Sequence, residues 1–123
     1  MTEQEARIRL RRAGGLLREV DFYREQQELF KRRNLPDCVR ECANRIESCL
    51  DEYQETIRVI AAIPSDAQRE TIKAAYLDGL PREVIAEDES VDLRTIYRRL
   101  ARGCKMFAQV YTQIKKPCEL VTG

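Results

Sequence analysis

Four basic side chains recur at helical spacing near the C-terminal end of the chain. They follow at steps of four, four and three residues: Arg94, Arg98, Arg102 and Lys105. On an α-helix these steps place all four side chains on one exposed strip. Such a row suits a polyanion, because phosphates supply most of the affinity and arginine also contacts guanine edges through two hydrogen bonds. The chemistry that the strip predicts is nucleic-acid binding.

The helix that must carry this strip has a second, apolar stripe. Its members are Leu93, Ile96, Leu100, Cys104 and Phe107. Their three- and four-residue steps predict a buried face. Asp92 precedes them as an N-cap, with its carboxylate placed to accept a hydrogen bond from the backbone N–H groups near Thr95. The helix is therefore predicted to begin at Leu93 and to continue to Ile114, with its distal half packed on the N-terminal hairpin or on a second subunit.

A shorter helix is predicted immediately before this one, after Gly79. Ile85 and Ala86 provide a branched and a small apolar residue where the first helix must contact the second, and Val91 fills the turn between them. Two short helices joined by a tight turn, the second rich in arginine, form a helix-turn-helix. This motif points to DNA.

The net charge of +1 hides a strong polarity along the chain. Residues 93–116 contain seven basic residues and no acidic residue, whereas residues 65–92 contain three basic and eight acidic residues. Such a charge distribution directs the basic helix toward nucleic acid, and the acidic neighbours disfavour other orientations of the protein on the duplex. A solvated helix face is the alternative interpretation of a charge run.

Glycine and proline are scarce and strand-like alternation is absent, so the chain is predicted to be all-α. A first helix runs from about Gln4 to Arg33 and ends near Asn34, and a second ends at Pro64. Their apolar seams consist of Ala13, Leu16, Val20, Tyr23 and Phe30 on the first helix, and Val39, Cys42, Ile46, Cys49, Tyr53, Ile57, Ile60 and Ile63 on the second. The two helices either fold back as an antiparallel hairpin or join a partner chain in a coiled coil. A third helix, capped by Ser65, is predicted to end at Gly79.

The predicted organisation has three parts. Residues 1–63 form a long helical hairpin, a candidate oligomerisation or partner-binding segment. Residues 64–116 form the helix-turn-helix DNA-binding domain, and residues 117–123 form a tail. The sequence contains no apolar run approaching the roughly 20 residues of a membrane span, and its charged N-terminus lacks the apolar segment of a secretory signal. We expect a cytoplasmic protein that does not enter a membrane.

The five cysteines are expected to be reduced thiols, since their number is odd and no secretory signal accompanies them. Cys38, Cys42 and Cys49 share a helical face that could present thiolates to a metal ion. The chain has no histidine and no evident fourth ligand, which favours small buried hydrophobic residues instead. Glycine-rich phosphate loops and activated nucleophiles are also missing from the sequence. We therefore expect no enzyme activity, cofactor or metal.

The segment from Ile63 to Phe107 resembles region four of bacterial sigma factors, which recognises the −35 promoter element. It is more similar still to the small phage and prophage regulators of the ArpU-like and RinA-like type, in which a helical N-terminal segment precedes a sigma-like end. The resemblance covers about residues 57–107 and is carried by Arg69, Tyr76, Gly79, Ile85, Ala86, Val91, Arg94, Thr95, Ile96, Tyr97 and Leu100. The chain departs from that pattern at Glu89, at Ser90 and at the pair Gly103 and Cys104. It has no counterpart of the sigma region that melts the −10 element.

Roles for individual residues follow if the second helix enters the major groove, because its first turns then face base edges. The predicted base-reading residues are Leu93, Arg94, Tyr97 and Arg98, and the predicted phosphate contacts are Arg82, Arg99, Arg102 and Lys105. Tyr97 has an alternative role as a core residue with its hydroxyl at the rim. Thr95 is expected to support the cap. A second basic cluster, Arg7, Arg9, Arg11 and Arg12, either touches flanking DNA or is a solvated helix start.

The leading hypothesis is a sequence-specific, DNA-binding transcription regulator of phage or prophage type. Its partners would be double-stranded DNA and, as further candidates, RNA polymerase and a second copy of the chain. A rival hypothesis is a helical adaptor that binds polymerase or another protein. A third is a small terminase-like subunit for DNA packaging, which would use the same motif.

Overall fold

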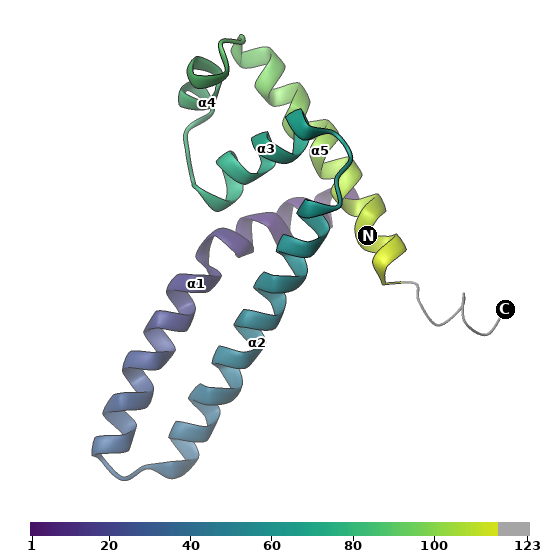
Figure 1. Ribbon diagram of the computed structural model, residues 1–123. Coiled ribbons are helices and arrows are strands. Elements are labelled where there is room, and N and C mark those ends of the chain that lie inside the picture. The colour runs from purple at the N-terminus through teal and green to yellow at the C-terminus, as the bar shows by residue number, and fades with distance from the viewer. Residues whose placement is uncertain (116–123) are drawn as a thin grey trace, which may run out of the picture. The chain divides into compact units, whose positions relative to one another are not determined.

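The elements observed in the chain are helices joined by short connections. The computed structural model describes residues 1–115, and these contain no strand (Figure 1). The helices are α1 (Glu3–Arg32), α2 (Pro36–Ala61), α3 (Asp66–Ile72), the π-helix η1 (Lys73–Leu77), α4 (Arg82–Glu89) and α5 (Leu93–Ile114). The predicted all-α class, with a long hairpin followed by a smaller helical bundle, is confirmed. The predicted tail at residues 117–123 lies outside the described residues.

Packing divides the chain into two compact units. One unit, here called the bundle unit, contains residues 1–14 and the described residues from Thr56 onward. The other, here called the hairpin unit, contains residues 15–55. Both α1 and α2 therefore contribute residues to each unit. The functions expected for residues 1–63 and 64–116 stay predictions.

The hairpin unit consists of two antiparallel helices that lie side by side (Figure 1), and their connection contains a residue with a left-handed backbone conformation. Asn34 adopts φ +54°, and the backbone N–H of Leu35 donates to the Phe30 carbonyl at 3.0 Å. This is the helix-ending geometry that asparagine tolerates, and Pro36 then begins α2 without losing a hydrogen bond. The Gln27 side-chain amide donates to the Val39 carbonyl at 3.3 Å and joins the two helices near their connection. The predicted end near Asn34 is confirmed.

The seam of the hairpin unit is only partly covered. Leu16 and Val20 on α1 and Cys42 on α2 are buried. The remaining predicted seam residues of this unit are half-buried: Tyr23, Phe30, Val39, Ile46, Cys49 and Tyr53. Two helices without a third layer leave one side of their shared face in contact with solvent.

The bundle unit contains the main hydrophobic core. Phe107, Ile96 and Cys104 of α5 are fully buried, together with Ile72 of α3 and Leu10 of α1. Fully burying a large aliphatic or aromatic side chain contributes about 1.5–3 kcal/mol. This core packs α3 and α4 on α5 and includes residues from the start of α1. Near the C-terminal end of α5, the Met1 amino group donates to the Thr112 hydroxyl at 3.2 Å. Of the two predicted contacts for the distal half of α5, the N-terminal hairpin and a second subunit, the structure shows the first, made by the start of α1.

The third predicted helix begins as expected but changes its winding. The Ser65 hydroxyl accepts from the Gln68 backbone N–H at 3.3 Å, which confirms the predicted cap. After Ile72 the helix widens into η1, and the Asp78 N–H donates to the carbonyl five residues earlier, on Lys73, at 3.0 Å. The expectation of one regular helix up to Gly79 is corrected in this respect. Gly79 itself has φ +68°, a conformation that favours glycine.

Gly103, one of the departures from the sigma-like pattern, allows α5 to approach α3 closely. A Cβ atom added to Gly103 would lie 2.7 Å from Cγ1 of Ile72. A larger residue here would require the Ile72 side chain or one of the two helices to shift, and Cys104 beside it fills a fully buried position.

Candidate nucleic-acid interface

The turn between α4 and α5 is held by backbone hydrogen bonds around a left-handed serine. Ser90 has φ +56° and ψ +42°, and the Val91 N–H donates to the Ala86 carbonyl at 3.0 Å. Ile85 and Ala86 are 3% and 7% exposed, and Val91 packs partly buried against the core. The predicted packing of Ile85, Ala86 and Val91 between the two helices is confirmed. The residue at the turn adopts a conformation that costs a side-chain-bearing residue roughly 1–2 kcal/mol.

Asp92 fixes the start of α5. One of its carboxylate oxygens accepts from the Thr95 hydroxyl at 2.7 Å and from the Thr95 backbone N–H at 2.8 Å. These bonds hold the pKa of Asp92 below its ordinary value, and the positive charges of Arg94 and Arg98 lower it further. Both the predicted cap and the supporting role of Thr95 are confirmed.

The exposed side of α5 carries the four predicted basic side chains. Arg94, Arg98, Arg102 and Lys105 are all exposed, whereas Ile96, Leu100, Cys104 and Phe107 are buried and Leu93 is half-buried. We call the four exposed residues the basic strip. It spans about 16 Å along the helix at 1.5 Å per residue. Within residues 1–115, none of the four lies within ion-pairing distance of a carboxylate.

The predicted base-reading residues occupy the first two turns of α5. Arg94 and Arg98 project from the exposed side, and Tyr97 is 53% exposed. The alternative role of Tyr97 as a core residue is wrong, because the ring lies outside the buried stripe. Leu93 borders the core and the surface. These four side chains therefore form one continuous group at the N-terminal end of the helix.

The predicted phosphate contacts are not brought together as one group. Arg102 and Lys105 belong to the basic strip, whereas Arg99 is turned toward the end of α4. Its guanidinium lies 4.0 Å from the Glu89 carboxylate, and its side chain is only 24% exposed. Glu89 is exposed and faces Arg99.

Arg82, the remaining predicted phosphate contact, lies at the start of α4. Its guanidinium is 5.8 Å from the centre of the Tyr76 ring. Two arginines from the second predicted basic cluster, Arg7 and Arg11 of α1, line the same hollow as Arg82 and Tyr97. The sequence could not place Arg7 and Arg11 here, because the contact joins residues roughly 70 to 90 positions apart.

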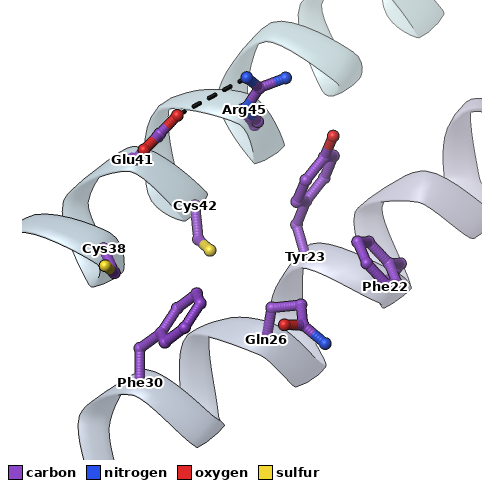
Figure 2. A pocket seen from close by; sticks show the side chains of 8 residues that line it. All are labelled: Phe22, Tyr23, Gln26, Phe30, Cys38, Glu41, Cys42 and Arg45. Atoms are coloured by element: carbon purple, nitrogen blue, oxygen red, sulfur yellow. Dashed lines mark ion pairs between the residues drawn. The ribbon is translucent and has the colours of Figure 1, made fainter. Parts of the chain in front are cut away.

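A separate hollow of 220 Å³ lies in the hairpin unit (Figure 2). Its aromatic lining includes Tyr23 and Phe30, and the Arg45 guanidinium lies 5.8 Å from the centre of the Tyr23 ring and 3.6 Å from the Glu41 carboxylate. Cys38 and Cys42 also line it. Among residues 1–115 no disulfide forms, and no group of three cysteine or acidic side chains is arranged to hold a metal ion.

No helix in residues 1–115 combines the length and the apolar character that crossing a membrane requires.

Comparison with known proteins finds no matching family model, no matching curated protein and no matching solved structure.

Proposed function

We propose that the chain is a sequence-specific regulator of transcription that binds double-stranded DNA by placing α5 in the major groove. The observation that carries this proposal is the basic strip. Its four side chains are exposed, lie on one face of a capped helix and have no carboxylate partner among the described residues. The proposal assigns no catalytic step and no cofactor.

Recognition would begin at the N-terminal end of α5. Arg94 and Arg98 can each donate two hydrogen bonds to O6 and N7 of a guanine, the most frequent specific contact in the major groove. Tyr97 and Leu93 present apolar atoms beside them, which suit a thymine methyl group. Arg102 and Lys105 lie farther along the helix, where phosphates of the groove edge come within reach.

The charge around α5 would select its orientation on the duplex. Exposed acidic side chains cover α4 and the turn: Glu83, Glu87, Asp88 and Glu89. Phosphates repel this surface and attract the basic strip, so only one side of the bundle unit favours approach to the duplex. The same arrangement makes binding sensitive to salt, because each neutralised phosphate releases condensed counterions.

The test compares two double variants with the same change in charge. Arg94→Glu with Arg98→Glu changes the basic strip, and Arg18→Glu with Arg24→Glu changes exposed arginines of the hairpin unit. Affinity for a duplex selected from a random library should be abolished in the first variant and largely retained in the second. Circular dichroism should show that both are folded. Equal affinities in the two variants would contradict the assignment of α5 to the groove.

An adaptor function is the second candidate, and the surface of the hairpin unit favours it. Phe22 is 54% exposed beside the partly covered seam, with its ring 5.3 Å from that of Tyr23. An interface built on such apolar groups should barely respond to salt. DNA binding through several phosphates should weaken steeply as salt rises. The salt dependence of binding to RNA polymerase and to DNA therefore separates the two candidates.

A further inference from the structure

A hollow beside α5 brings together three arginines from two other helices. It has a volume of 160 Å³ and lies within the bundle unit. Arg7 and Arg11 of α1 line one part of it, and Arg82 of α4 lines another. Tyr76, Tyr97 and Ala101 also belong to its lining. Residues far apart in the sequence thus build one positively charged concavity.

The charge of this hollow is only partly compensated. No acidic side chain belongs to its lining. Arg7 is paired with Glu3 at 3.2 Å, whereas the guanidinium of Arg82 is stacked over Tyr76. Burial raises the pKa of Tyr76, and the positive charges of Arg82 and Arg11 oppose that rise. The Tyr76 hydroxyl therefore keeps its proton near neutral pH, and the phenol adds no negative charge.

The hollow and the basic strip share a border on α5. Tyr97 follows Arg94 by three residues, and Ala101 follows Arg98 by three, so these side chains are neighbours on the helix surface. Ala101 also lies one turn before Lys105. Between the hollow and the basic strip lies Ala101, whose small side chain leaves them nearly continuous. An extended anion on the basic strip can therefore continue into the hollow.

We propose that this hollow binds a phosphate of the DNA backbone that lies beside the bases contacted by α5. The inference rests on the proposed function and extends it to Arg7 and Arg11 of α1. A single phosphate presents oxygens that several guanidinium groups can share, and arginine matches that geometry with paired N–H groups. A contact from α1 would hold the DNA backbone at a second point outside α5. It would thereby fix the orientation in which α5 enters the groove.

The experiment combines one protein change with single changes in the DNA. The duplex obtained by selection is prepared with one methylphosphonate linkage at a time, which removes the charge of that phosphate alone. Binding is measured for the wild-type chain, for Arg11→Gln, and for Arg18→Gln as a control on the same helix outside the hollow. Arg11 and Arg18 are both exposed, so neither substitution should disturb folding.

One linkage should reveal the contact. Its neutralisation should weaken wild-type binding roughly tenfold, the effect of losing hydrogen bonds to a charged group. It should weaken Arg11→Gln clearly less than the wild type, since one of the guanidinium groups that share the phosphate is already absent. The Arg18→Gln variant should respond as the wild type does. The logarithmic salt dependence of Arg11→Gln should also be shallower by about 0.9.

Equal responses of the wild type and Arg11→Gln at every linkage would overturn the inference while leaving DNA binding by α5 intact. Failure of the wild-type chain to select any duplex would instead overturn the proposed function, and this inference with it. A titration with inorganic phosphate, followed through the arginine side-chain NMR signals, distinguishes the source of the ligand. Phosphate binding at Arg11 without any DNA binding would assign the hollow to a free phosphate and contradict the DNA contact.

Discussion

Gly14 of α1 meets the backbone of Tyr76 with no room for a side chain between them. A Cβ atom at Gly14 would lie 2.5 Å from the Tyr76 carbonyl oxygen. This close approach places the first helix against η1, and it brings Arg11 to the same hollow as Tyr76. By residue type alone, two adjacent glycines inside a helix only lower its stability, by about 1 kcal/mol each relative to alanine. The structure gives the first of them a packing role.

The two adjacent glycines should respond in opposite ways to alanine. Gly14→Ala should destabilise the bundle unit by about 1–3 kcal/mol, because the new methyl group overlaps a backbone oxygen. Gly15→Ala should stabilise α1 by up to about 1 kcal/mol, since its Cβ would meet only the Arg18 guanidinium, at 3.9 Å. Urea unfolding of both variants measures the difference. Changes of the same sign and size would contradict the close approach at Tyr76.

Replacing Ser90, whose backbone lies in the left-handed region, with glycine should increase the stability of the folded chain. Ser90→Gly should stabilise the chain by about 1 kcal/mol, because glycine adopts φ +56° without the steric cost of a Cβ atom. Ser90→Ala is the matched control, since it removes the hydroxyl but keeps Cβ. Thermal unfolding should show a gain for glycine alone. An equal gain for alanine would mean that the serine hydroxyl, rather than the backbone conformation, carries the cost.

The Asp92 cap should make stability depend on pH in the acid range. Its pKa is lowered in the folded chain by the Thr95 hydroxyl and backbone N–H, so its ionised form stabilises the fold at neutral pH. That contribution is present above the ordinary pKa of 3.8 and is lost as pH falls through the lower, folded value. Asp92→Ala should be less stable than the wild type at neutral pH and approach it near about pH 2.

Asp92→Asn serves as the control for this titration. Asparagine caps a helix as well as aspartate does and has no proton to gain. Its stability relative to Asp92→Ala should stay constant across the same pH range. A constant difference between wild type and Asp92→Ala down to the lowest pH would show that the charge of Asp92 does not contribute.

Arg99 and Arg102 should differ in their effect on DNA binding. Arg102→Gln removes an exposed member of the basic strip, and it should make the logarithmic salt dependence of binding shallower by about 0.9. Arg99→Gln should change this dependence much less, because Arg99 is mostly covered and faces Glu89. Binding titrations at several salt concentrations compare the two. A larger effect from Arg99 would contradict the position of its guanidinium beside α4.

Local signals made much of the fold predictable. Ser65 and Asp92 accept hydrogen bonds from backbone groups only three residues away, so residue type and the following apolar pattern identify both caps. Asn34 ends α1 through the same short-range geometry. The buried and exposed stripes of α5 follow directly from helical periodicity. These features depend on neighbours along the chain.

The remaining features depend on contacts between distant residues. The widening of the third helix into η1 has no signal in Lys73–Leu77, and one side of this segment packs where Gly14 approaches Tyr76. Arg99 and Arg98 are adjacent and chemically identical, yet only one faces Glu89. The hollow is lined by both Arg7 of α1 and Arg82 of α4. The sequence contains no pattern that would place these two residues near each other.

The central claim is that α5 reads DNA sequence, and selection from a randomised duplex library at near-physiological salt tests it most directly. The purified, folded chain should enrich one motif, and Arg94→Glu with Arg98→Glu should lose that enrichment. A palindromic motif would indicate a dimer with paired half-sites, and an asymmetric motif would indicate docking as a single copy. A folded wild-type chain that enriches no motif would contradict the account and favour the adaptor function.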